Sequence, residues 1–281
     1  MIRIFAIDID GTLLNTSSLI DVKTIEALKD LEETGVRVVL NSGRVFSSVL
    51  YYARMISNNP IVIANNGAVL GTDFDNIIKS YPMDDIILQK LVNIAKENDL
   101  DYHFYDLDSY YSDHFNEKKL KHLLKDKRVK DDYSVNLAIS DDPIGDFKKK
   151  NKMAYKFQIN GLNNLADSDK NIENIFKKEF VNLLYFTSSI SGVLEMMVKG
   201  VSKFETLLYL TDLTGLAREN IAAIGDGMND LEMLKGARLS FAMGNGHDRI
   251  KDIADFTVAD NDKGGVIEAC EKIKEHNRCL I

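Results

Sequence analysis

The chain has 281 residues, close to the size at which a single hydrophobic core stops growing, so one large domain or two smaller ones are expected. Hydrophobic residues make up 45% and charged residues 28%, as in ordinary water-soluble proteins, and no apolar run approaches the length of a membrane span. The first ten residues show no cleavable signal pattern, which favours a cytoplasmic location. The net charge of −8 argues against general binding to nucleic acid or to an anionic membrane, because both need a basic surface.

The cysteines and one basic segment give two further predictions. Cys270 and Cys279 are the only cysteines and lack a metal-type spacing, so neither a disulfide framework nor a thiolate zinc site is expected. Residues 117–130 carry seven Lys or Arg against two acids. We expect this segment to form a solvated helix face, and attraction of an anionic substrate to a cleft is the alternative.

Buried strands alternate with amphipathic helices in the first part of the chain. In chain order they are strand 2–9, helix 21–33, strand 36–40, helix 45–56 and strand 61–64. The first helix carries Val22, Ile25, Leu28 and Leu31 on one predicted face. Strands and helices that alternate in this way form a parallel sheet with both faces covered, and functional loops then gather at the carboxyl ends of the strands.

From about residue 84 to residue 189 the pattern changes to that of a separate α+β unit. Its predicted elements are helix 84–98, strand 155–159, helix 163–178 and strand 181–186. The first pattern then returns, which indicates that the chain leaves a parallel-sheet unit and comes back to it. The returning elements are helix 202–213, strand 221–224, a Gly-rich loop, a short helix, strand 239–242 and a helix from Gly264.

Two aspartates follow the first predicted strand. Because the strand ends at Asp8, the following loop can bring Asp10 round to the same point. Two carboxylates so close repel each other, and in an apolar setting one would bind a proton unless a cation lay between them. Mg2+ with oxygen ligands fits this pattern best, and an ordinary Asx-type turn is the alternative.

Polar groups also follow two other predicted strands. Ser42, in Asn-Ser-Gly-Arg, places a hydroxyl and backbone amides where a phosphate can bind, although the same residues also suit a simple loop and helix cap. Asp226 and Asp230 follow strand 221–224 and would complete an oxygen-rich Mg2+ site with the first pair, although acids are common at helix N-termini anyway. Lys203 lies in the first turn of a helix, where the dipole disfavours a cation unless it faces carboxylates and phosphate; the alternative is that it extends into solvent.

These four motifs, in this order, resemble those of the haloacid dehalogenase superfamily, and the long insert resembles the Cof-type branch (subfamily IIB, C2 cap). The resemblance implies an α/β fold, with a Rossmann-like parallel-sheet core over residues 1–83 and 190–281 and an inserted α+β cap domain over 84–189. Two residues depart from the family pattern. Ser42 stands where Thr is usual and keeps the hydroxyl, and Phe204 stands where Gly is usual and is expected to narrow the site beside the motif lysine.

By this resemblance the chain is a Mg2+-dependent phosphomonoester hydrolase that acts on a small phosphorylated metabolite such as a sugar phosphate. Asp8 is implied as the nucleophile that forms an aspartyl-phosphate, and Asp10 as the general acid and base. Ser42 and Lys203 are implied to hold the phosphoryl oxygens. The implied metal ligands are Asp8, the Asp10 backbone carbonyl, Asp226 and Asp230. The candidate substrate contacts are Gly11, Gly43, Arg44, Asn66 and Asn229.

Two other functions stay open, a phosphomutase on a sugar phosphate and a non-catalytic protein that binds a phosphometabolite. Substrate choice is expected to lie with the cap. There the stretch 102–106 either faces the substrate or contributes to the core and surface of the cap. The expected partner is a small phosphorylated metabolite, without nucleic acid or membrane, and both a monomer and a small homo-oligomer fit the sequence.

Overall fold

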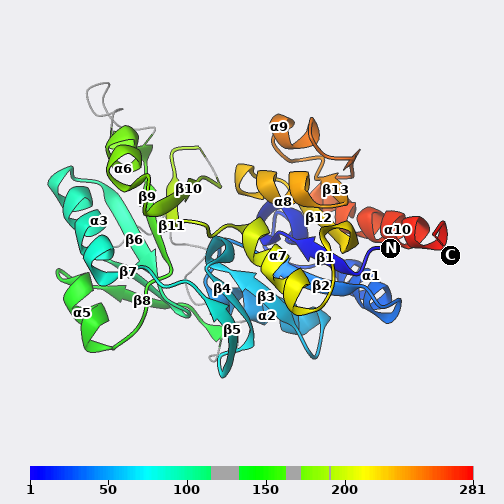
Figure 1. Ribbon diagram of the computed structural model, residues 1–281, viewed down its shortest axis with the longest axis horizontal. Coiled ribbons are helices and arrows are strands. Elements are labelled where there is room, and N and C mark those ends of the chain that lie inside the picture. The colour runs from blue at the N-terminus through cyan, green and yellow to red at the C-terminus, as the bar shows by residue number, and fades with distance from the viewer. Residues whose placement is uncertain (115–132, 163–171, 190, 281) are drawn as a thin grey trace.

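The computed structural model of the chain describes residues 1–114, 133–162, 172–189 and 191–280 and contains two β-sheets, set side by side in Figure 1. Within these residues no helix is long and apolar enough to cross a membrane. The basic segment 117–130 and the first part of the predicted helix 163–178 lie outside the described residues.

The larger sheet has eight strands in the order β14-β13-β12-β1-β2-β3-β4-β5. All neighbours from β14 to β3 pair in parallel, and β4 and β5 extend the sheet antiparallel at one edge. The predicted α/β fold with a parallel core is confirmed. The strands are β1 (Ile4–Ile7), β2 (Arg37–Asn41), β3 (Ile61–Ala64), β4 (Val69–Asp73), β5 (Asn76–Ser80), β12 (Ile221–Gly225), β13 (Leu239–Ala242) and β14 (Phe256–Thr257).

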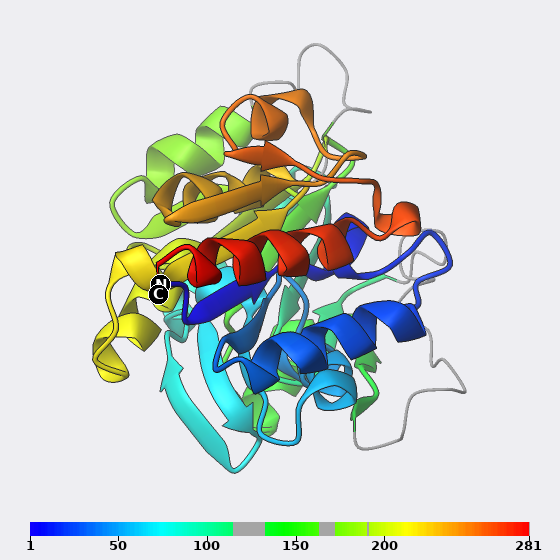
Figure 2. The same ribbon diagram turned by 90° about the vertical axis from the view of Figure 1, so that its right-hand side faces the viewer.

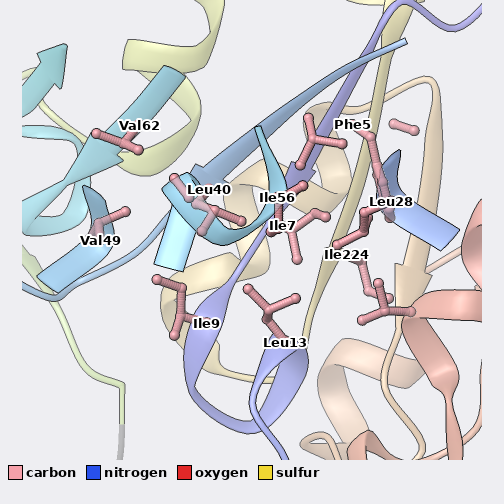
Figure 3. Packing of buried hydrophobic residues seen from close by; sticks show 14 of the residues in the cluster. Phe5, Ile7, Ile9, Leu13, Leu28, Leu40, Val49, Ile56, Val62 and Ile224 are labelled. Carbon is pink, nitrogen blue, oxygen red and sulfur yellow. The ribbon is translucent and has the colours of Figure 1, made fainter. Parts of the chain in front are cut away.

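Helices cover both faces of this core sheet. Successive residues of β1 point to opposite faces, so Phe5 and Ile7 join one apolar cluster and Ile4 and Ala6 the other. Figure 3 shows Phe5 and Ile7 packed near Leu28 in the first cluster. The helices of that face are α1 (Val22–Glu33), α2 (Phe46–Ile56) and α10 (Gly265–Arg278), of which α1 and α10 lie side by side (Figure 2). Those of the other face are α7 (Lys203–Leu213), α8 (Leu231–Gly236) and α9 (Asp248–Lys251).

The smaller sheet has six strands in the order β10-β11-β9-β6-β7-β8, antiparallel except for the pair β7 and β8. Its strands are β6 (Asp101–Tyr105), β7 (Ser109–Ser112), β8 (Asn136–Ile139), β9 (Lys156–Asn160), β10 (Leu184–Thr187) and β11 (Leu194–Val198). Its apolar face packs against α3 (Asp85–Glu97), α5 (Pro143–Lys149) and α6 (Ile172–Phe180), which lie on the side away from the larger sheet (Figure 1). The opposite face is therefore left to face the core.

The structure corrects two predictions about individual elements, and it adds to the cap sheet one strand that was not predicted. The six-stranded sheet extends beyond residue 189, because β11 pairs with β9 and β10; its mostly apolar sequence resembles that of a core strand. The predicted strand 181–186 begins only at Leu184, since α6 continues to Phe180, whose ring is buried in the cap. Val22 is 70% exposed, because the buried face of α1 starts at Thr24.

Candidate active site

The acidic motifs meet at the carboxyl ends of β1 and β12, which are neighbours in the core sheet. Asp8 directly follows β1, and Asp226 directly follows β12. One carboxylate oxygen from each of Asp8, Asp226 and Asp230 lies within 4.8 Å of the other two. The parallel order of the sheet thus brings together side chains from opposite ends of the chain, as the strand pattern predicted.

The loop after β1 packs directly on Asp226. Gly11 has φ +75, and a Cβ at this position would lie 2.3 Å from the Asp226 Oδ2 atom, so a side chain could not be accommodated. The Thr12 hydroxyl donates a hydrogen bond of 3.2 Å to Asp226 Oδ1. These contacts set the position of Asp226 relative to the aspartates after β1.

Lys203 faces the carboxylates rather than solvent. Its Nζ donates to Asp8 Oδ1 at 2.5 Å and to Asp230 Oδ1 at 2.6 Å, and its side chain is buried. The second oxygen of Asp230 accepts hydrogen bonds from the backbone N–H groups of Asp226 and Gly227 at 3.1 and 3.0 Å. Asp230 therefore links the lysine to the loop after β12 and holds both in place.

Burial and like charge dominate the electrostatics of this cluster. Burial raises the pKa of Asp8 well above its usual range, and the carboxylate of Asp230 raises it further. The same two causes raise the pKa of Asp226 to about 7. Burial alone would lower the pKa of Lys203, but Asp230 and Asp8 outweigh it and raise the pKa, so the lysine stays protonated. One cation thus faces three acids, and this set of oxygen donors fits a divalent ion such as Mg2+.

Asp10 points away from that cluster. Its carboxylate is 62% exposed and accepts hydrogen bonds from Arg44 Nε at 2.7 Å and from Arg44 Nη2 at 2.6 Å. Such a two-pronged pair is among the stronger charged contacts in proteins. The carboxylates of Asp8 and Asp10 therefore do not converge on one point, and that of Asp10 is not among the three that gather in the cluster.

A cavity of about 580 Å³ lies over these residues, between the two sheets. Its core wall includes Asp8, Asp10, Ser42, Gly43, Arg44 and Asn229. Its cap wall includes His103, Tyr105, Lys156, Gln158, Asn160 and Glu195. The stretch 102–106 is divided between the cap core and the cavity wall, because Tyr102 and Phe104 are buried in the cap core while His103 and Tyr105 line the cavity.

The cap wall is a hydrogen-bonded network that the sequence analysis did not identify. His103 Nε2 lies 2.7 Å from the Tyr105 hydroxyl, and its Nδ1 lies 3.1 Å from Asn160 Nδ2. Lys156 Nζ donates to Glu195 Oε1 at 2.8 Å, and both side chains are 3% exposed. The available signal was a Lys and a Glu, each between two apolar residues, since charged side chains are rarely buried unless they are paired.

The family follows from the comparisons with known proteins. The sequence profile of the haloacid dehalogenase-like hydrolases matches residues 5–270. The chain belongs to this family. It is 29% identical over 276 residues to the 5-amino-6-(5-phospho-D-ribitylamino)uracil phosphatase YitU of Bacillus subtilis, covering 94% of both chains. It is 27% identical over 269 residues to YcsE, a second phosphatase of the same organism named for the same substrate, covering 95% of this chain and 94% of that one.

Solved structures agree with this assignment. A haloacid dehalogenase-like hydrolase from Bacteroides thetaiotaomicron superimposes with a TM-score of 0.80 at 25% identity, covering 97% of this chain and 100% of that chain. A subclass IIB sugar phosphatase shares the fold with a TM-score of 0.76 at 20% identity, covering 97% and 99%. The predicted membership of the haloacid dehalogenase superfamily is confirmed, and the chain is a phosphatase of this family.

Two asparagines of this phosphatase that were predicted to contact the substrate lie in different places. Asn229 lines the cavity, whereas Asn66 is 1% exposed and lies behind the wall, where its Oδ1 accepts a 3.3 Å hydrogen bond from Asn229 Nδ2. The expectation that Phe204 narrows the site is wrong. The ring points to α8, and a Cβ at Gly236 would lie 1.9 Å from its Cζ atom. One step along a helix turns a side chain by about 100°, so the residue after Lys203 faces the neighbouring helix.

Proposed function

We propose that this phosphatase hydrolyses a small phosphomonoester with Mg2+ and through a phosphoaspartate on Asp8. The buried cluster of Asp8, Asp226, Asp230 and Lys203 beneath the cavity carries the proposal. Phosphoryl transfer depends mainly on positioning and on neutralising the charge of the phosphoryl oxygens. A fixed lysine and an oxygen-rich cation site at the cavity floor suit both needs.

The proposed reaction has two steps. An oxygen of Asp8 attacks phosphorus, the bond to the leaving oxygen breaks, and Asp10 gives that oxygen a proton. Water then attacks phosphorus, Asp10 takes its proton, the bond to Asp8 breaks, and inorganic phosphate leaves. In both steps the Ser42 hydroxyl and the Lys203 ammonium would hold the phosphoryl oxygens. Because both oxygens of the Asp10 carboxylate accept hydrogen bonds from Arg44, substrate binding has to loosen that pair before Asp10 passes a proton to the leaving oxygen.

The ion would be held by Asp8, the backbone carbonyl of Asp10 and Asp226, with Asp230 orienting it directly or through water. When bound, Mg2+ supplies positive charge that stabilises the phosphoryl group as it transfers. The lack of positive charge in the cluster supports this assignment. Without such a cation, burial and mutual repulsion keep the pKa values of Asp8 and Asp226 raised.

We infer that the leaving group is neutral and forms hydrogen bonds. Among the described wall residues, the cap lysine and glutamate pair with each other and Arg44 pairs with Asp10, so the wall offers hydrogen bonds rather than a dedicated site for a second anionic group. Gln158 and Asn160 can bond hydroxyl or N–H groups. The names of the Bacillus subtilis relatives specify a phosphorylated ribitylaminouracil, whose leaving group is of this kind.

We assign the catalytic core to residues 1–83 and 190–281 and substrate selection to the cap, 84–189. Strand β11 joins the cap sheet from the second core segment. The position of the cavity between the two sheets supports this division of roles.

A panel of phosphomonoesters with Mg2+ tests the proposal, with released phosphate as the readout and kcat/KM as the measure. We expect phosphate release from monophosphates with neutral leaving groups, and slower release from bisphosphates. An isomerised sugar phosphate without free phosphate, dependent on a bisphosphate activator, would identify a mutase. Binding without any turnover would identify a non-catalytic protein.

A further inference from the structure

The buried pair Lys156–Glu195 connects the cap sheet to the core loop that carries Ser42. Lys156 lies on β9 and Glu195 on the neighbouring β11, where Glu195 is in register with Gln158. Burial alone would raise the pKa of Glu195, but the ammonium of Lys156 outweighs it and the pKa falls below its usual value. Glu195 is therefore ionised, and its hydrogen bond holds the lysine in place from the cap side.

Lys156 also reaches across the cavity to the core. Its Nζ donates a 2.6 Å hydrogen bond to the backbone carbonyl of Gly43, and it lies 4.5 Å from the centre of the Tyr105 ring. An ammonium group has three N–H donors. The Glu195 carboxylate and the Gly43 carbonyl engage two of them, and the ammonium group also lies over the Tyr105 ring, so Lys156 is held mainly by contacts within the protein.

The bond to Gly43 acts on the peptide group between Gly43 and Arg44. The C=O and N–H of a trans peptide point in opposite directions. With its carbonyl held by Lys156, this peptide directs its N–H to the Ser42 Oγ atom, 3.3 Å away. Ser42 Oγ therefore accepts a bond from its own loop, and its hydroxyl hydrogen is left to donate to another acceptor in the cavity that it lines.

We propose that Lys156 is a positioning residue, which ties the cap to the phosphate-binding loop and sets the direction of the Ser42 hydroxyl. This inference rests on the proposed role of Ser42 and assigns a new role to a cap residue. A residue that recognises the leaving group changes the preference among substrates. Lys156 instead acts, through the Ser42 hydroxyl, on the phosphoryl group, which is common to all substrates.

The test replaces both charges at once, as Lys156→Met with Glu195→Gln, because removing one partner alone would leave a buried charge unpaired. We expect kcat/KM to fall about tenfold to a hundredfold, by the same factor for phosphomonoesters with an alkyl, a sugar and an aryl leaving group. Lys150→Met is the matched control, since Lys150 is an exposed cap lysine outside the cavity lining, and it should leave kcat/KM unchanged. A loss that differs by leaving group would overturn the proposal.

A second measurement asks whether Lys156 acts through Ser42. In a Ser42→Ala background the paired replacement should lower kcat/KM by less than about threefold, because the hydroxyl that it positions is already gone. The full loss in that background would show that the two act independently and would contradict the proposal. If the paired replacement does not fold, Lys156→Gln together with Glu195→Gln tests the same tie with a shorter, uncharged donor and leaves no buried charge unpaired.

The affinity for inorganic phosphate in the presence of Mg2+, measured by calorimetry, separates this inference from the proposed function. Phosphate binding requires no turnover, so it reports on the loop even if no substrate is hydrolysed. We expect the paired replacement and Ser42→Ala to weaken phosphate binding to a similar degree, and their combination to weaken it little further. Unchanged phosphate affinity in the paired variant would refute the positioning role.

Discussion

The two sheets supply functional groups to one cavity in different ways. In the parallel core, the groups lie in loops at the strand ends, within short contiguous motifs such as Asp8 to Asp10 and Asp226 to Asp230. In the antiparallel cap, they lie on the strands themselves, as His103, Lys156 and Glu195 on β6, β9 and β11. In the proposed division of roles, the chemistry therefore resides in compact motifs and the selection of substrate in a sheet face, which exists only once the strands have paired.

The two walls also differ in how they hold buried charge. Three carboxylates and one lysine form the core cluster, where burial and repulsion raise the pKa values of Asp8 and Asp226. In the cap one lysine meets one glutamate, whose pKa is lowered. The donor set of the core site consequently suits a cation, whereas in the cap wall the lysine and the glutamate are paired with each other.

The largest effect should come from the core. Asp8→Asn removes the proposed nucleophile and should lower phosphate release by at least about 10³-fold. No phosphoenzyme should be detected by mass spectrometry after acid quench. Asp30→Asn, an exposed aspartate on α1, is the matched control and should keep full activity. A phosphoenzyme that persists in Asp8→Asn would place the nucleophile elsewhere.

Asp10→Asn should divide the reaction into its two steps. We expect about a 10²- to 10⁴-fold loss with an alkyl phosphate, because the leaving oxygen needs a proton. An aryl phosphate needs none, so the phosphoenzyme should still form and then accumulate, since no base activates water. Rapid-quench measurement of both steps checks this. Near-normal turnover of the alkyl phosphate would remove Asp10 from its proposed role.

In the cap, alternate residues of β6 should behave differently. His103→Ala alters the cavity wall and should change the ratio of kcat/KM between two leaving groups by about tenfold. Tyr102→Phe changes the opposite face of the strand and should leave that ratio unchanged. It should lower the free energy of unfolding by about 1 kcal/mol, because the 3.0 Å hydrogen bond to Asp113 is lost. Equal shifts in selectivity from both variants would contradict the strand-face interpretation.

The smallest effect is a pH-dependent one on stability. The usual pKa of Asp226 is 3.8 and the folded value is about 7, so without metal the folded state binds the extra proton and loses stability as pH rises from about 4 to about 7. Mg2+ displaces that proton, so saturating Mg2+ should raise the melting temperature by about 5 °C at pH 8 and by less at pH 5.5. Asp226→Asn should abolish the difference, and an equal shift at both pH values in the unmodified protein would exclude this coupling.

Much of the core could be predicted because its patterns are local. Strands β3 and β13 were placed with their observed bounds, and the motifs after β1, β2 and β12 lie at the strand ends where they were expected. The antiparallel strands β4 and β5 were not predicted, because they interrupt the alternation of strand and helix on which the prediction of the core was based. Phe204 was misplaced because its direction depends on the packing of α7 against α8.

The sequence by itself determined the alternation of strands and helices in the parallel core, because this depends on periodicity, and it offered short motifs whose resemblance to a known family implied the residues proposed for phosphoryl chemistry. Tertiary structure alone decided that Asp10 pairs with Arg44, that Asn66 lies behind the wall and that Lys156 reaches Gly43. These contacts join residues that are distant in the chain. Their geometry depends on strand register and on the placement of the cap over the core, which no local pattern encodes.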